Sequence, residues 1–177
     1  FFFGNIKLSD TEIFSGLEDF HSHILPGVDD GVSKIEESLQ ILRLYESLGV
    51  RKLWLTPHIM EDIPNSTVAL MDKFENLKAN YSGPIELRLA AEYMLDSLFI
   101  SRLESKDLLP LGDEKQYLLV ETSFWVGSNI LYEMLQQIFS SGFFPVLAHP
   151  ERFGYMTEDD YDRLLSMGVK FQLNIPS

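Results

Sequence analysis

The chain has 177 residues, 45% hydrophobic and 23% charged, which is enough for one domain with a sizeable core. Its formal net charge of -13 argues against nucleic acid as a partner, since such binding relies on Lys and Arg neutralising phosphates. The absence of cysteine excludes disulfides, thiolate metal ligands and cysteine nucleophiles. No apolar run reaches the roughly 18 residues of a membrane span, so we expect no membrane insertion. Nothing directs export, and the cytoplasm is the expected location.

The first half of the chain predicts alternating strands and helices after a lead-in arm over residues 1–16. Ser33 is expected to cap the first helix, with Glu36 at the capping-box position, and Gly49 to end it. Pro57 should end the second strand and leave His58 at the start of a loop. The expected strands are 17–23, 50–56 and 85–91, and the expected helices are 34–48 and 67–80.

The second half continues the alternation. Thr157 is a suitable N-cap for the last helix, which Gly168 should stop. The expected strands are 117–120, 143–148 and 169–173, and the expected helices are 96–104, 127–141 and 158–167. Strands separated by helices indicate right-handed parallel βαβ units. The residues named below as candidate metal ligands follow several different strands. We therefore expect an α/β fold of the closed or nearly closed barrel type, whose active sites lie at the carboxyl ends of the strands.

The sequence Asp19-Phe20-His21-Ser22-His23 carries the first candidate site. Residues two apart on a strand face the same way, so His21 and His23 can reach one metal ion, and Asp30 can fold back to add a carboxylate. Asp29 competes with Asp30 for that role. The remaining candidates each come after an apolar run or at a strand end: His58, Glu92, Glu121 and His149.

Imidazoles mixed with carboxylates favour Mn, Fe or Zn as the metal, and seven ligands exceed what one ion needs. We therefore expect two or more ions, which can hold a phosphate and activate water. Each candidate alone also has an ordinary structural reading, such as a turn, a cap or a core histidine. Arg152 is expected to bind a phosphate oxygen, with a salt bridge as the alternative. Phe124 and Trp125 are expected either to wall an aromatic pocket or to pack in the core.

Several motifs together resemble one family. They are Asp-Phe-His-Ser-His-Ile-Leu-Pro-Gly-Val-Asp-Asp-Gly from residue 19, Thr56-Pro57-His58, Ala91-Glu92, Val120-Glu121-Thr122 and Ala148-His149-Pro150-Glu151-Arg152. The chain, from about residue 17 to its end, is similar to the polymerase-and-histidinol-phosphatase (PHP) superfamily. Within it, the resemblance is to the bacterial manganese-dependent protein-tyrosine phosphatases of capsule and exopolysaccharide loci.

The resemblance implies a distorted seven-stranded (βα) barrel, here over residues 17–177, with two or three ions in the intact protein. It implies metal ligation by His21, His23, Asp30, His58, Glu92, Glu121 and His149, with Glu92 bridging, catalytic roles for Asp30 and His58, and phosphate binding by Arg152. The implied reaction is attack of a metal-bridging hydroxide on phosphotyrosine of a tyrosine kinase that controls polysaccharide export.

One departure from the family concerns its late Asp-x-His motif, which does not follow His149 in this sequence. On six expected strands, the last strand and its ligands are missing, which predicts weaker metal binding, impaired turnover and an open sheet edge that favours a homo-oligomer. Two other functions stay open. They are a small-molecule phosphatase, for instance for histidinol phosphate, and a non-catalytic metal-binding or kinase-docking module.

Overall fold

The computed structural model describes residues 13–123 and 128–174. The chain forms two compact units. The first comprises Phe1–Pro57 and Leu70–Leu89, and the second comprises His58–Ala69 and Ala90–Ser177. The N-terminal arm lies largely outside the described residues, and Phe124 and Trp125 lie wholly outside them.

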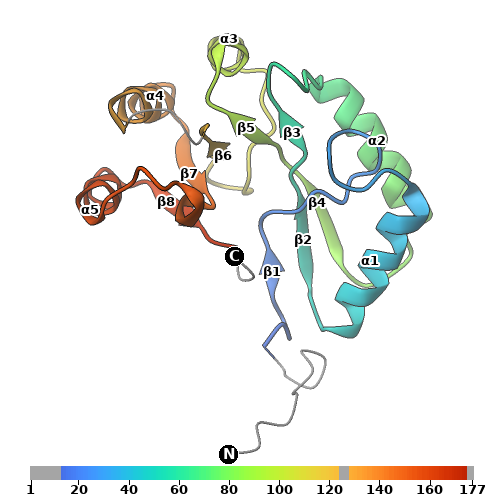
Figure 1. Ribbon diagram of the computed structural model, residues 1–177. Helices are drawn as coiled ribbons and strands as arrows, with labels where there is room; N and C mark the ends of the chain where they lie inside the picture. The colour runs from blue at the N-terminus through green and yellow to red at the C-terminus, as the bar shows by residue number, and fades with distance from the viewer. Residues whose placement is uncertain (1–12, 124–127, 175–177) are drawn as a thin grey trace, which may run out of the picture. The chain divides into compact units, whose positions relative to one another are not determined.

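The first unit contains a three-stranded parallel sheet with the order β1-β2-β4 (Figure 1). Its strands are β1 (Glu18–Asp19), β2 (Lys52–Leu55) and β4 (Glu86–Leu89). Helix α1 (Ile35–Ser47) buries Ser38 and Leu42, and the Ser38 hydroxyl donates to the Ile24 carbonyl at 2.8 Å. Helix α2 (Thr67–Asn80) buries Leu70 and Leu77. The resulting core fixes the segment that follows β1.

The second unit contains a five-stranded parallel sheet with the order β3-β5-β6-β7-β8. Its strands are β3 (His58–Ile59), β5 (Glu92–Met94), β6 (Tyr117–Glu121), β7 (Phe144–Ala148) and β8 (Lys170–Gln172). The accompanying helices are α3 (Ser97–Ser105), α4 (Ser128–Ser140), α5 (Glu158–Ser166) and the 3-10 turn η2 (Pro150–Arg152). Strand β6 is buried over Leu118–Glu121, so it forms the centre of this unit.

The predicted α/β class with parallel strands is confirmed, and each of the five α-helices in the described residues begins and ends within one residue of its predicted limits. Thr157 caps α5 as predicted, since its hydroxyl accepts from the Asp160 N–H. The predicted cap of α1 is wrong. The helix is capped at Lys34 rather than Ser33, and the Glu37 carboxylate, not that of Glu36, accepts from the Lys34 N–H at 3.2 Å.

Six strands were predicted, whereas the described residues form eight. The predicted strands 50–56 and 85–91 are each followed by a second short strand, β3 and β5, which pairs in the other sheet. Pro57 has no N–H to donate and ends β2, after which His58 starts β3 instead of a loop. The first strand was predicted over 17–23 but covers Glu18–Asp19 only; beyond it, the Ser22 N–H donates to the Thr56 side chain rather than to a backbone carbonyl.

The structure describes no helix long and apolar enough to cross a bilayer.

Candidate metal centre

Four candidate ligands of the second unit come together because neighbouring parallel strands place them there. His58 on β3 is in register with Glu92 on β5, and Met94, two residues further along β5, is in register with Glu121 on β6. His149 directly follows β7, the next strand of the sheet. The strand pairing therefore brings side chains from four separate segments to one place.

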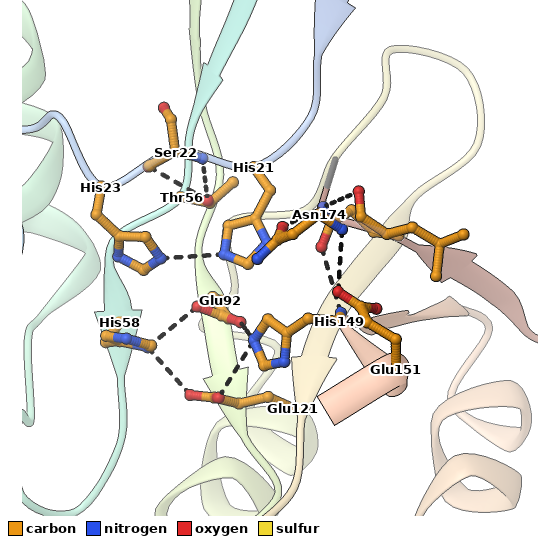
Figure 2. A network of polar contacts seen from close by, with 12 residues as sticks. His21, Ser22, His23, Thr56, His58, Glu92, Glu121, His149, Glu151 and Asn174 are labelled. Carbon is orange, nitrogen blue, oxygen red and sulfur yellow. Dashed lines mark hydrogen bonds and ion pairs between the residues drawn. The ribbon is translucent and has the colours of Figure 1, made fainter. Parts of the chain in front are cut away.

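Figure 2 shows the two imidazoles facing the two carboxylates. His58 Nδ1 lies 3.2 Å from Glu92 Oε2 and 3.1 Å from Glu121 Oε1. His149 Nε2 lies 2.9 Å from Glu92 Oε1 and 3.6 Å from Glu121 Oε2. Glu92 is fully buried and His149 is 5% exposed. Each carboxylate thus bridges both histidines inside the fold. We call His58, Glu92, Glu121 and His149 the buried cluster.

The buried cluster suits a divalent cation. With neutral imidazoles its formal charge is that of its two carboxylates, and burying such charge without compensation costs several kcal/mol per ion. Ligand atoms from His58, Glu92 and Glu121 all lie within 4.8 Å of one another. Neighbouring ligands bound at about 2.0–2.2 Å to one ion are themselves about 3–3.5 Å apart, which matches the contacts in the cluster. The mixed nitrogen and oxygen donors fit Mn, Fe or Zn.

The backbone at His149 has a left-handed conformation, with φ 32° and ψ 50°, which is uncommon for a residue with a side chain. Its N–H donates to the carbonyl of Gln172 in β8 at 2.7 Å, and its own carbonyl accepts from the Arg152 N–H at 3.0 Å. The Tyr161 hydroxyl of α5 donates to the Pro150 carbonyl at 2.9 Å. Strand β8 and helix α5 thus hold the turn that carries the His149 imidazole.

In the first unit, His21 and His23 point the same way, as the alternation along an extended chain predicts. Their Nε2 atoms are 3.0 Å apart. Ser22 between them points the opposite way (Figure 2). Its hydroxyl donates to the Trp54 carbonyl at 2.9 Å and its N–H donates to Thr56 Oγ1 at 3.0 Å. This anchoring directs both imidazoles to one point, at the spacing of neighbouring ligands of one ion.

The loop after His23 supplies two carboxylates with different positions. Asp29 Oδ2 lies 2.8 Å from His23 Nδ1, and Asp29 Oδ1 accepts from the Gly31 N–H at 3.0 Å. A carboxylate on one ring nitrogen orients the other toward a metal, which is a frequent arrangement around histidine ligands. A carboxylate oxygen of Asp30, an exposed residue, lies within 4.8 Å of a ring nitrogen of His23. Asp29, considered only as a competitor in the sequence, is therefore the residue that orients His23.

Asp19, the acidic residue that precedes His21 and His23, is partly buried. Burial raises the pKa of Asp19, against the opposing effect of the His21 N–H, which donates to Asp19 Oδ1 at 3.2 Å.

Arg152, expected to contact phosphate, ends the η2 turn and is exposed. No pattern in the sequence pointed to Gln172, whose role depends on its backbone carbonyl.

Comparison with known proteins places this chain in a family. A protein-family model described as capsular polysaccharide synthesis, CpsB/CapC, matches residues 17–177. The tyrosine-protein phosphatase CpsB of Streptococcus pneumoniae is 31% identical over 166 residues, which are 88% of this chain and 66% of that protein. The tyrosine-protein phosphatase YwqE of Bacillus subtilis is 28% identical over 138 residues, 76% of this chain and 54% of that protein.

Among solved structures, one from a study of YwqE of Bacillus subtilis and CpsB of Streptococcus pneumoniae, described as metal-dependent tyrosine phosphatases, has the same fold. The TM-score is 0.75 at 24% identity, over 89% of this chain and 66% of that one. The chain spans about half the length of YwqE. The resemblance to the phosphatases of capsule loci is thereby confirmed, and the chain belongs to the CpsB/CapC family of capsular polysaccharide synthesis proteins.

Proposed function

We propose that this chain carries the metal-binding and phosphoryl-binding residues of a metal-dependent protein-tyrosine phosphatase. The observation that supports it most is the buried cluster, two carboxylates and two imidazoles at about 3 Å, in a chain of the CpsB/CapC family. The relatives CpsB and YwqE are named tyrosine-protein phosphatases. The full activity, with its substrates and partners, is proposed for the whole protein, because this chain spans only part of the length of its relatives.

The proposed ligands are those predicted from the sequence: His21, His23, Asp30, His58, Glu92, Glu121 and His149. Manganese is the proposed metal, with Fe and Zn as the alternatives that the same donors accept. Bound divalent ions supply charge for the phosphoryl oxygens and lower the pKa of water. Asp29 orients His23, and the β8 carbonyl of Gln172 orients His149. A distorted seven-stranded barrel remains part of this proposal.

The phosphoryl group is held, in this proposal, by Arg152 in addition to the ions. Its guanidinium can offer two parallel N–H donors to two phosphate oxygens, and its exposed position leaves it accessible to a protein substrate. The chain contains no cysteine, so none of its residues can form a phosphocysteine. In this proposal, water activated by the bound ions would accept the phosphoryl group directly. The proposed substrate is phosphotyrosine on a bacterial tyrosine kinase of capsule synthesis.

The test measures phosphate release from a phosphotyrosyl peptide by the Mn²⁺-loaded chain, with Glu92→Gln and excess chelator as negative controls. Turnover that needs Mn²⁺ and is lost in Glu92→Gln supports the proposal. Histidinol phosphate is assayed in parallel. Hydrolysis of histidinol phosphate alone would establish the small-molecule alternative. Mn²⁺ binding without turnover of either compound would mean that this chain by itself binds metal without catalysing the reaction.

A further inference from the structure

The loop that follows His58 is fastened to the first turn of α3. The Glu61 N–H donates to Asp96 Oδ2 at 2.8 Å, and the Ser97 hydroxyl donates to the Glu61 carboxylate. The other oxygen of Asp96 caps α3 by accepting from the Phe99 N–H at 2.9 Å. One aspartate therefore closes the helix N-terminus and holds the start of the loop.

The end of the same loop is fastened to the last turn of α3 by Arg102. Its Nη1 donates to Asp107 Oδ2 and its Nη2 to the Asn65 carbonyl, both at 2.7 Å. The second oxygen of Asp107 accepts from the Thr67 hydroxyl at the start of α2, at 2.6 Å. The Arg102 side chain is 11% exposed. A shielded guanidinium thus joins α3, the loop and the first residue of α2.

Asn65 connects this fork to the buried cluster. Its side-chain amide donates to the backbone carbonyl of His58 at 3.0 Å, while its own carbonyl accepts from Arg102. Two hydrogen bonds therefore separate the guanidinium from the candidate ligand. Strand β3 consists of His58 and Ile59, and within the part of the chain that the structure describes it pairs with β5 alone, at the edge of its sheet. So short an edge strand has few ladder hydrogen bonds to hold it, so the contacts of the loop add to the buried Ile59 side chain in fixing its position.

We propose that Arg102, acting through Asn65, is a positioning residue that sets the orientation of His58 and thereby the divalent-ion affinity of the buried cluster. The inference rests on the proposed function, because it assumes that the cluster binds metal. It requires arginine specifically. The planar guanidinium directs two donors at two fixed acceptors, whereas the ammonium of lysine is a point charge that cannot reproduce that fork.

The experiment measures Mn²⁺ affinity by calorimetry for Arg102→Met, Arg102→Lys and Asn65→Ala. Residues that orient metal ligands typically change affinity by about 10–100-fold, so we expect about a tenfold loss for Arg102→Met and for Asn65→Ala, and a smaller loss for Arg102→Lys. Both residues act through the one hydrogen bond from Asn65 to the His58 carbonyl. The double variant Arg102→Met/Asn65→Ala should therefore bind Mn²⁺ about as weakly as either single variant.

The control for general destabilisation is Tyr81→Phe in the first unit, which removes the hydroxyl that accepts from the Ile85 N–H. It should lower the melting temperature without changing Mn²⁺ affinity. Arg102 variants that bind Mn²⁺ as the unaltered chain does, or additive losses in the double variant, would overturn the inference. If Arg102→Met does not fold, Arg102→Lys and Asn65→Ala decide it. Unaltered chain that binds Mn²⁺ without phosphotyrosine turnover contradicts the proposed function alone, and the affinity comparison then decides the inference as before.

Discussion

The two units place their candidate ligands by different means. In the second unit, the parallel strands β5, β6 and β7 place Glu92, Glu121 and His149, and these three residues are buried. In the first unit, a loop with few ladder hydrogen bonds orients His23 through Asp29, and the ligands are partly exposed. A sheet fixes side chains through many shared backbone contacts, whereas a loop depends on a few specific ones. Substitutions in the loop should therefore act through single contacts, and those in the cluster through charge.

The largest effect is expected from Glu92→Gln. Glu92 contacts both histidines of the buried cluster, so its loss should weaken Mn²⁺ binding more than the roughly 10–100-fold typical of supporting residues. Saturating metal at about 100 times its Kd stabilises a fold by about 2.7 kcal/mol, and thermal unfolding with and without Mn²⁺ should show this gain disappear.

The metal-free Glu92→Gln chain should unfold no earlier than the unaltered one, because one of two neighbouring buried carboxylates has lost its charge. Glu133→Gln, at an exposed position in α4, is the matched control and should keep the metal-induced gain. An unchanged gain in Glu92→Gln would show that the cluster does not bind the ion.

The next effect tests the loop of the first unit through Gly31→Ala. A Cβ at Gly31 would overlap the His23 carbonyl oxygen and lie 2.6 Å from the His23 Cβ. The loop must shift, at a cost of about 1–3 kcal/mol, and His23 should lose its alignment with His21. Chemical denaturation and Mn²⁺ titration measure the two consequences.

Gly154→Ala is the matched control, since a Cβ there meets nothing within 4 Å. It should change neither the free energy of unfolding nor Mn²⁺ affinity. Equal behaviour of the two variants would mean that the close approach of Gly31 to His23 does not constrain the loop.

The same comparison explains what the sequence could predict. Helices follow from local signals such as the Thr157 cap, and the alternation of His21 and His23 follows from local geometry. The seven candidate ligands could be singled out, but not the pairing of His58 with Glu92, because two-residue strands carry no periodic pattern. Asp29 rather than Asp30 contacts His23 because the Gly31 N–H holds the Asp29 carboxylate in the turn. Two adjacent aspartates look alike in a sequence, so this choice could not be predicted.

A smaller effect separates those two aspartates. Asp29→Ala removes the oxygen 2.8 Å from His23 Nδ1, so the ring loses the contact that orients it, and Mn²⁺ affinity should fall by about tenfold. Asp29→Asn keeps a carbonyl acceptor and should lose less. If Asp30 is a ligand, Asp30→Asn should lower affinity more than Asp29→Asn does. The reverse order would assign Asp29 to the metal and Asp30 to the solvent.

The smallest effect concerns acid stability in the second unit, where α5 supports the turn after His149. Hydrogen bonds from the Thr157 N–H and hydroxyl, with a further one from Tyr132, lower the pKa of Asp160 below its ordinary 3.8. A carboxyl with a lowered folded pKa contributes stability that is fully present above its unfolded pKa and is lost as pH falls through the folded pKa. Acid unfolding followed by circular dichroism between pH 5 and about 2 should therefore be flatter below pH 3.8 in Asp160→Asn than in the unaltered chain. The metal-free Glu92→Gln chain is the control, because it retains the Asp160 contacts. Its stability should fall with pH below 3.8 as steeply as that of the unaltered chain. If Asp160→Asn retains the slope as well, the cap does not contribute to it, and the acid sensitivity of this unit belongs to other carboxylates.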